Sequence, residues 1–155
     1  VSISSVVNLQ RISDGTAYDL IAPLVIATLD SNGSTTIAVA TFAGGFLLPV
    51  PVSGNYTLSV DAIGYVTATG LNIPLASDDV VASTVELKGG WVDSDSIVGI
   101  RDISAAAAFF GQSTGDGTDS SGRIVDINGD GDVDAMDISL IASNFGLVGP
   151  LIWPE

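Results

Sequence analysis

Oxygen-bearing side chains recur at a fixed spacing between residues 126 and 137. Numbered as a twelve-residue loop, the segment has side-chain oxygens at positions 1, 3, 5, 9 and 12, which are Asp126, Asn128, Asp130, Asp134 and Asp137. Calcium takes about six to eight oxygen ligands, and in such a loop position 7 supplies a backbone carbonyl. A solvated acidic turn is the alternative interpretation. The spacing favours a calcium loop. Its predicted ligands are the side chains of Asp126, Asn128, Asp130 and Asp137 and the backbone carbonyl of Asp132 at position 7.

The same pattern occurs a second time, 35 residues upstream. When Val98 to Gly111 is aligned with Val133 to Gly146, seven of fourteen positions are identical. Such a match indicates a duplicated unit. The predicted ligands of the upstream loop are Asp93, Asp95, the carbonyl of Ile97, and Asp102 at position 12.

The upstream loop departs from the template at positions 1 and 6, and its position 9 is Gly99, which has no side-chain oxygen. Position 1 is Trp91, which cannot bind a metal ion, and position 6 is Ser96, whereas the downstream loop has Gly131 there for the sharp turn. Three carboxylates and a carbonyl could still hold calcium together with extra waters. We therefore expect calcium in both loops, with weaker affinity in the first, and an empty first loop is the open alternative.

Each loop runs into apolar residues at helical spacing and ends in Phe-Gly, where a glycine cap is expected. The sequence therefore predicts two loop–helix units of the EF-hand-like type. Because Ala107 and Phe110 repeat as Ala142 and Phe145, we expect these side chains to pack in the core.

The composition limits the chemistry that the chain can perform. Without His or Cys, Ser-His-Asp and Cys-His catalysis and zinc sites built from these ligands are excluded. The formal net charge of -14 disfavours nucleic acid and anionic membrane surfaces as partners. No apolar run approaches the roughly 18 residues of a membrane-spanning helix. The carboxylates lie at metal-ligand spacing with no second constellation beside them, so we expect no enzymatic activity.

The first 88 residues have a different pattern, with short runs rich in Val, Ile and Thr between turn dipeptides such as Asp14-Gly15, Asn32-Gly33 and Gly54-Asn55. The predicted strands are Val6 to Ile12, Leu24 to Leu29, Thr36 to Phe42, Tyr56 to Ala62, Val66 to Leu71 and Val80 to Leu87. Strands at this spacing favour an antiparallel β-sandwich of immunoglobulin-like architecture.

The composition changes after Gly89-Gly90, because ten of the eighteen acidic residues fall between Asp93 and Asp137. We therefore predict two small domains, a sandwich over residues 1–88 and an all-α calcium-binding domain over residues 89–155, joined by a short linker at these glycines. Because the linker is short, we expect little flexibility between the halves and packing of the sandwich on the residues that follow. Val1 begins within a strand-like pattern and lacks the layout of a signal peptide, so we expect a segment of a longer protein.

Residues 90–154 resemble a type I dockerin. The resemblance is carried by the duplicated loop, by Asp at position 12, and by the Asp-Ile-Ser sequence that opens each helix. It implies a module that plugs a protein into a cohesin-bearing scaffold. It also implies that loop positions 10 and 11 contact the cohesin, here Ile100, Arg101, Ala135 and Met136. Because these residues differ between the two copies, a symmetric dual binding mode is not expected.

Residues 1–88 resemble the carboxypeptidase regulatory-like domain, a prealbumin-type sandwich. The matching pieces are Ser13-Asp14-Gly15, the stretch from Gly54 to Val60, and Gly64-Tyr65. In that family the domain is a spacer or stabiliser without chemistry of its own. Beside a dockerin, the resemblance implies the role of an X module.

Together the resemblances imply calcium-dependent docking by a secreted or cell-surface protein, of the kind that forms the end of polysaccharide-degrading enzymes in cellulosome-like assemblies. The alternative is a calcium-stabilised stalk or spacer of a surface protein without a cohesin partner. Some dockerins also have a clasp between terminal aromatic residues, which here would join Trp91 to Trp153 or Pro154. A frayed tail is the alternative for Trp153.

Overall fold

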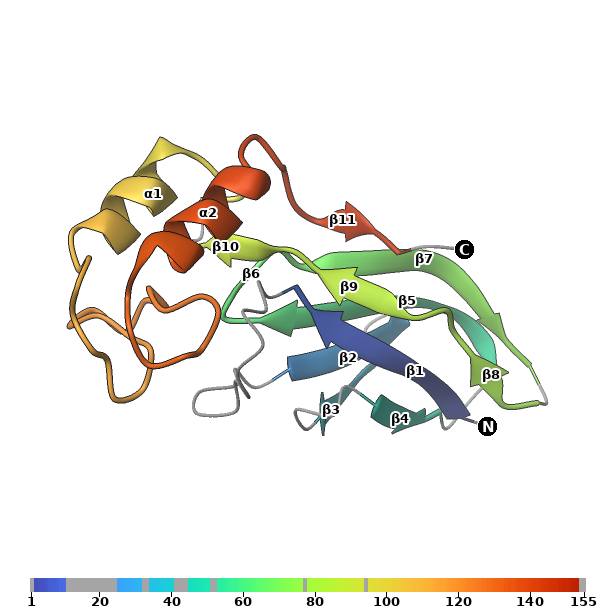
Figure 1. The fold of residues 1–155 in the computed structure, drawn as a ribbon. Coiled ribbons are helices and arrows are strands. Elements are labelled where there is room, and N and C mark those ends of the chain that lie inside the picture. Colours follow the sequence, from blue (N-terminus) through green and yellow to red (C-terminus); the bar gives the residue numbers. More distant parts are fainter. Residues whose placement is uncertain are drawn as a thin grey trace.

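The structure is a computed structural model that describes residues 2–10, 25–31, 34–40, 45–50, 53–76, 78–93 and 95–153. These residues form a mostly β structure with two short helices, α1 (Ile100–Ala107) and α2 (Ala135–Ser143). The sheets lie at one end of the molecule, and the helices with their long loops lie at the other (Figure 1).

The larger sheet has the strand order β11-β7-β5-β2-β3. Its strands are β2 (Val25–Ser31), β3 (Ser34–Ala40), β5 (Gly54–Ala62), β7 (Ala68–Leu75) and β11 (Leu151–Ile152). In β5 the side chains of Tyr56, Leu58 and Val60 are buried, whereas the residues between them are partly exposed. This alternation confirms the predicted strand from Tyr56 to Ala62 and shows that one of its faces is buried.

The second sheet is built around β1 (Ser2–Leu9). β1 pairs antiparallel with β4 (Gly45–Pro49) but parallel with β8 (Val80–Val81) and β9 (Val85–Leu87). The prediction of a purely antiparallel sandwich is therefore wrong. After β7 the chain crosses to the other sheet and arrives beside β1 in the same direction, which a hairpin connection cannot achieve.

Several predicted strands differ from the observed ones. β4 lies in a stretch for which the sequence predicts no strand, and Gly54-Asn55, predicted as a turn, opens β5. The predicted strand Val80 to Leu87 is interrupted after Val81, where the hydroxyl of Ser5 donates to the carbonyl of Ser83 at 2.7 Å. The predicted turns at Asp14-Gly15 and Asn32-Gly33, and the motif Ser13-Asp14-Gly15, lie outside the described residues.

The buried apolar side chains form two clusters. One fills the sandwich and includes Leu29, Leu48 and Leu58. The other lies beneath the helices and includes Val98, Val133 and Ile141. Each half of the structure thus has its own core.

The two glycines predicted as a linker are part of a strand. Gly89 and Gly90 belong to β10 (Gly89–Trp91), which pairs antiparallel with β6 (Gly64–Tyr65), and both are buried. A Cβ on Gly89 would lie 2.9 Å from the Ile127 side chain, and one on Gly90 would lie 2.9 Å from the Ile141 Cα. Glycine is needed here because the two halves pack closely. The prediction of a linker is therefore wrong, although the expected packing of the sandwich on the following residues is observed.

The C-terminal part is not all-α, which corrects the predicted fold class. Residues after 88 contribute β10 and β11 to sheets as well as the helices α1 and α2. A boundary at residue 88 stays a prediction. In the described part of the chain, neither helix has the length and apolar character needed to cross a membrane.

Candidate metal centre

The first predicted loop closes around Asp102, the aspartate at position 12. This side chain is fully buried. Its Oδ1 accepts hydrogen bonds from the backbone N–H groups of Val92 at 2.6 Å and Asp93 at 3.0 Å, and its Oδ2 accepts one from Gly99 at 2.7 Å. Asp102 therefore ties the start of the loop to the start of α1.

The second loop closes around Asp137 in the same way. Its Oδ1 accepts hydrogen bonds from Ile127 at 2.7 Å and Asn128 at 3.1 Å, and its Oδ2 accepts one from Asp134 at 2.9 Å. These donors occupy loop positions 2, 3 and 9, as they do in the first loop. The two loops therefore share one backbone course.

The first loop has the same backbone conformation at position 6 as the second loop, although its residue there is not glycine. Gly131 has a φ of 100°, and Ser96 has a φ of 79°, the one positive value among the described non-glycine residues. A side chain disfavours this conformation by about 1–2 kcal/mol. The loop imposes the left-handed turn on Ser96 despite this cost.

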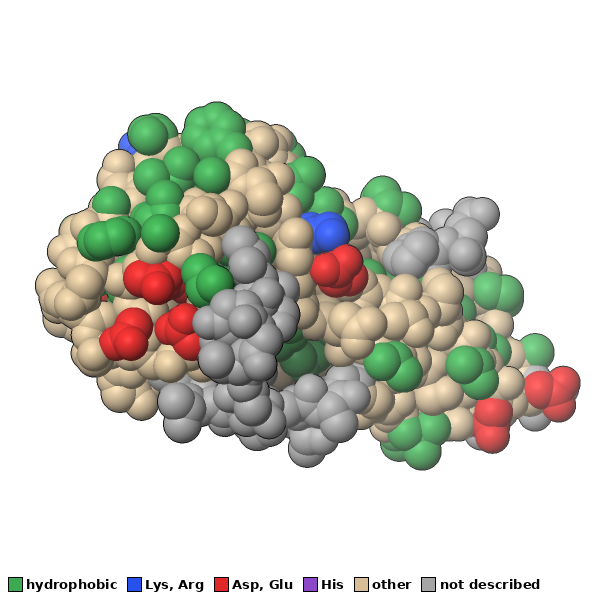
Figure 2. All heavy atoms as spheres, viewed as in Figure 1, with side chains coloured by type: hydrophobic (Ala, Val, Ile, Leu, Met, Phe, Trp, Pro, Cys, Tyr) green, Lys and Arg blue, Asp and Glu red, His purple; other side chains and the backbone are tan. Residues whose placement is uncertain are grey.

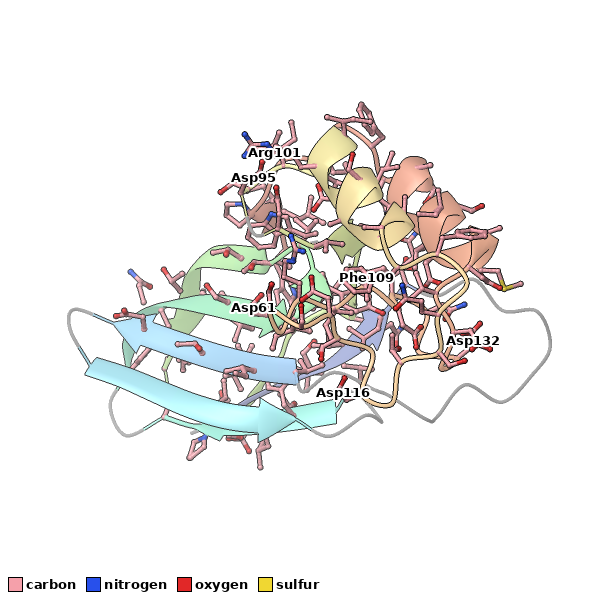
Figure 3. All side chains as sticks on the ribbon, turned by 90° about the vertical axis from the view of Figure 1, so that its left-hand side faces the viewer. Asp61, Asp95, Arg101, Phe109, Asp116 and Asp132 are labelled. Carbon is pink, nitrogen blue, oxygen red and sulfur yellow. The ribbon has the colours of Figure 1, made fainter. Side chains whose placement is uncertain are left out.

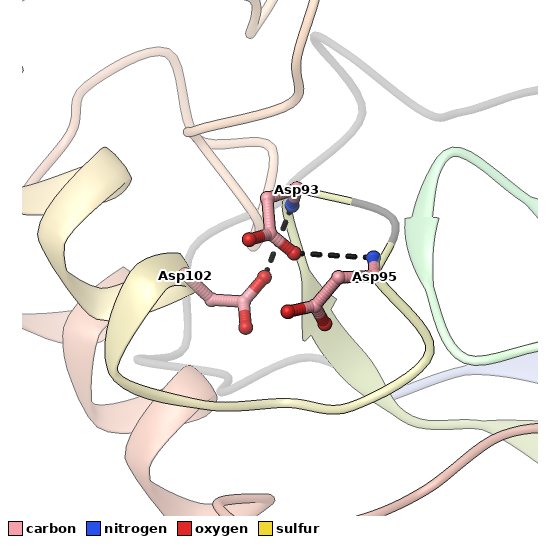
Figure 4. A group of neighbouring side chains, drawn as sticks. All are labelled: Asp93, Asp95 and Asp102. Atoms are coloured by element: carbon pink, nitrogen blue, oxygen red, sulfur yellow. Dashed lines mark hydrogen bonds between the residues drawn. The ribbon is translucent and has the colours of Figure 1, made fainter.

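In the first loop the acidic side chains converge. The ligand atoms of Asp93, Asp95 and Asp102 all lie within 4.8 Å of one another, and no other described group of three or more such residues does so. Figure 4 shows the three carboxylates turned toward one point inside the loop. Burial raises the pKa of the Asp93 carboxyl, and the nearby charge of Asp102 raises it further. Three converging carboxylates suit a hard cation such as calcium.

The second loop has an aspartate at position 1, where the first loop has Trp91. Asp126 is buried, and its Oδ1 accepts a hydrogen bond from Gly129 at 2.7 Å while its Oδ2 accepts one from Gly131 at 2.8 Å. This carboxylate organises the turn from within. The side chains of Asn128 and Asp130 each accept a hydrogen bond from the backbone two residues further on, as Asp93 and Asp95 do in the first loop.

Two carboxyl groups of the second loop have a raised pKa. Burial raises the pKa of Asp137 to about 6, although backbone N–H donors oppose the shift. Burial also raises the pKa of Asp126, and the charge of Asp130 adds to this. A cation among these oxygens would favour their ionised forms. The converging carboxylates of the first loop are compatible with calcium, whereas the acidic side chains of the second loop form no such group of three among the described residues. The role of either set as ligands stays a prediction.

The two loops lie at opposite ends of an antiparallel helix pair. Backbone hydrogen bonds join Val98, just before α1, to Gly146 and Leu147, just after α2. Figure 3 shows Asp95 and Arg101 at one end of the pair and Asp132 at the other. Each loop is therefore attached to the C-terminal end of the other helix.

The predicted partner-contacting residues lie at the surface. Ile100 is 66% exposed, Arg101 and Ala135 are exposed, and Met136 is partly exposed. Their role in binding stays a prediction.

The prediction that Ala107 and Phe110 pack in the core is wrong. Ala107 and Ala142 are exposed, and Phe110 and Phe145 are each 58% exposed. Both phenylalanines follow the last turn of a helix, where the chain leaves the helix pair. Figure 2 shows hydrophobic side chains gathered over the helical end of the molecule. The duplication has thus preserved two exposed aromatic side chains as well as the loops.

The predicted clasp between the two tryptophans is also wrong. Trp153 belongs to the sandwich cluster and Trp91 packs against the other cluster. Trp153 is 6% exposed, and its Nε1 donates to the carbonyl of Ser83 at 3.1 Å. The strand pairing of β11 with β7 carries Trp153 onto the sandwich, so the tail is not frayed there. Pro154 lies outside the described residues.

Two residues at the junction of the halves are not among the site residues predicted from the sequence, although Tyr65 belongs to the Gly64-Tyr65 piece of the family resemblance. The hydroxyl of Tyr65 donates to the carbonyl of Ile127 at 2.9 Å. The Nδ2 of Asn144 donates to the carbonyl of Gly89 and to the Oε1 of Gln10, both at 2.7 Å. No local sequence pattern could have predicted these contacts, because the partners lie 55 to 134 residues away.

Comparison with known proteins identifies the fold. No protein-family model and no curated protein matches the sequence. Two solved structures from Acetivibrio cellulolyticus match, an N-terminal interface mutant and a C-terminal interface mutant of a type II cohesin–X-dockerin complex. The sequence identities are 22% and 23%, and each match has a TM-score of 0.75 and covers 95% of this chain and 96% of the matched chain. This protein therefore has the fold of a chain found in such a complex.

Proposed function

We propose that this chain is a non-catalytic, calcium-dependent docking module that binds a cohesin-type protein. The X-module-like part would be residues 1–88, and the dockerin-like part would be residues 89–155. The observation that carries the proposal is the equivalence of the two loops, in which Asp102 and Asp137 accept hydrogen bonds from the same three positions.

The duplicated loops favour the X-dockerin over the cohesin as the matching chain of the complex. The residues that the loop spacing predicts as ligands lie in two loop–helix units, and the N-terminal sandwich packs against both. A sandwich followed by such a pair corresponds to the order of modules in the name X-dockerin.

Calcium would act chiefly on stability. A unit of about 65 residues buries little apolar surface, and it usually needs additional stabilisation such as a bound metal. The carboxylates of Asp93, Asp95 and Asp102 repel one another at their observed separation. A divalent cation among them turns this repulsion into attraction, so the folded loop–helix pair should be more stable with calcium than without it.

The exposed side of the helix pair is the proposed binding surface. The large exposed apolar side chains on the helices and just beyond them include Ile100, Phe110, Phe145 and Val148, which are 58% to 66% exposed. Aromatic side chains are frequent binding hot spots, and an exposed apolar surface usually marks an interaction site. We add Phe110 and Phe145 to the contact residues predicted from the resemblance.

The proposal places the protein outside the cell or at its surface, where the parent chain could bring a polysaccharide-degrading activity to a scaffold. The alternative is a calcium-stabilised spacer without a cohesin partner. The close packing of the two halves is compatible with either role. The exposed phenylalanines favour docking, because a spacer gains nothing from them.

A binding assay with purified cohesins tests the proposal. The chain is immobilised and exposed to the type II cohesin of the Acetivibrio cellulolyticus complex and to a panel of other cohesins, with calcium or with chelator. We expect one or more to bind with calcium and to dissociate after chelation. The double variant F110S/F145S should lose binding while keeping its calcium-bound melting temperature. Calcium binding without capture of any cohesin would support the spacer, and capture that survives chelation would exclude calcium-dependent docking.

A further inference from the structure

Tyr65 joins the sandwich to the second loop. It lies in β6, and its side chain is 1% exposed. Its hydroxyl donates to the carbonyl of Ile127 at 2.9 Å. Ile127 is position 2 of the loop, between the predicted ligands Asp126 and Asn128. The hydrogen bond therefore ends within the part of the loop that has to place two ligands.

Both backbone polar groups of Ile127 form hydrogen bonds. Its carbonyl accepts from Tyr65, and its N–H donates to Oδ1 of Asp137 at 2.7 Å. Its side chain is 1% exposed and is the nearest neighbour of the position where a Cβ on Gly89 would lie. Position 2 is thus fixed between the sandwich and the position 12 carboxylate.

The first loop meets the sandwich in another way. Its position 2 residue, Val92, also donates to the position 12 carboxylate, Asp102. The contact with the sandwich is made by the backbone of β10, which pairs Trp91 with Gly64. The two loops match internally but differ in how the sandwich supports them.

From this difference we infer that Tyr65 is a positioning residue for calcium binding in the second loop, so that the sandwich sets the calcium affinity of that loop separately from the first. The inference rests on the proposed function, because it requires the second loop to bind calcium. A calcium-free loop tends to open, since its carboxylates repel. The Tyr65 hydrogen bond favours the closed backbone, and it thereby lowers the cost of bringing the ligands together.

The test is a calcium titration of the full chain and of the Tyr65→Phe variant, each freed of metal, followed by NMR. The Gly131 amide reports on the second loop, and the Ser96 amide reports on the first. Loss of one buried hydrogen bond corresponds to about a three- to tenfold change in affinity. We expect the dissociation constant at Gly131 to rise by this factor and that at Ser96 to stay unchanged.

Gln10→Leu is the matched control. It removes another hydrogen bond between the halves, the 2.7 Å bond from Asn144, which ends beyond α2 and not in a loop. Calcium affinity in this variant should match that of the unaltered chain. If Gln10→Leu weakens the second loop as much as Tyr65→Phe does, or if Tyr65→Phe weakens both loops equally, the contact has only a general stabilising role and the inference is wrong.

A second substitution keeps the inference testable if Tyr65→Phe does not fold. Incorporation of 3-fluorotyrosine at position 65 retains the ring and makes the hydroxyl a stronger donor. The affinity at Gly131 should then rise, and an unchanged affinity would count against the inference. If the unaltered chain binds no calcium, the proposed function fails as well. If it binds calcium and Tyr65→Phe binds equally well, only the role of Tyr65 fails.

Discussion

Val98 and Val133 occupy position 8 of the two loops, and each exchanges two backbone hydrogen bonds with the segment that follows the other loop's helix. The N–H of Val98 donates to Leu147 at 2.9 Å, and its carbonyl accepts from Gly146 at 2.8 Å. The N–H of Val133 donates to Gln112 at 2.9 Å, and its carbonyl accepts from Gly111 at 2.8 Å. This internal two-fold arrangement couples each predicted calcium loop to the end of the opposite helix.

Removal of the position 12 carboxylate should destabilise the chain even without calcium. Asp102→Ala removes the acceptor of three backbone N–H groups in a buried place. We expect the free energy of unfolding to fall by about 3 kcal/mol, measured by urea denaturation in calcium-free buffer. Asp95→Ala is the control, because Asp95 is exposed and accepts a single backbone bond from Ile97. Equal losses in the two variants would contradict the structural role of Asp102.

A carboxylate at position 1 should strengthen the first loop. Trp91→Asp gives this loop the residue that Asp126 provides in the second, where its oxygens organise the turn. We expect calcium affinity at the first loop to increase about tenfold by calorimetry, as one more charged ligand is added. The stability without calcium should fall, because Trp91 packs against the helical cluster. Trp91→Phe should leave calcium affinity unchanged, and a gain there would assign the effect to packing.

Gly90 should be intolerant of any side chain. Its φ is 107°, and a Cβ would lie 2.9 Å from the Cα of Ile141. Gly90→Ala combines the strained backbone with a clash against main chain, so we expect a loss of about 3 kcal/mol or more in the free energy of unfolding. Gly111→Ala separates the two causes, because Gly111 has a φ of 79° but open space around its Cβ position. That variant should lose only about 1–2 kcal/mol.

The stability of the calcium-free chain should depend on pH through Asp137. Burial raises the pKa of this carboxyl from 3.8 to about 6 in the folded state. The folded chain then binds more protons than the unfolded chain between these values, so the free energy of unfolding falls as pH rises from about 4 to about 6. We expect a loss of about 2–3 kcal/mol from this group.

Urea denaturation of calcium-stripped protein across this pH range measures the dependence on pH. Asp137→Asn retains an acceptor for the backbone and has no titratable proton, so its stability should fall less with rising pH. A steeper fall in the variant would contradict the assignment. Asp119 should act in the opposite direction and is present in both proteins. Its burial raises its pKa, but hydrogen bonds from Arg123 and from backbone groups lower it more.

The sequence by itself determined the local features of the helical half. The 35-residue duplication, the position 12 aspartates and the start of each helix are local patterns, in which spacing along the chain fixes the geometry. For the same reason the alternation in β5 was predictable from Tyr56 to Val60. Local spacing also located the three acidic residues Asp93, Asp95 and Asp102, which the structure brings together.

Only the tertiary structure decided how the halves meet and which repeated side chains remain exposed. Gly89 and Gly90 suggested a short linker, yet they form a strand in which Ile127 and Ile141 leave no space for a side chain. Phe110 and Phe145 suggested a core, yet each lies beyond the last turn of its helix and is exposed to solvent. Trp153 lies on the sandwich because β11, the strand that precedes it, pairs with β7. These outcomes depend on contacts between residues far apart in the chain. A pattern among neighbouring residues does not show which of these contacts form.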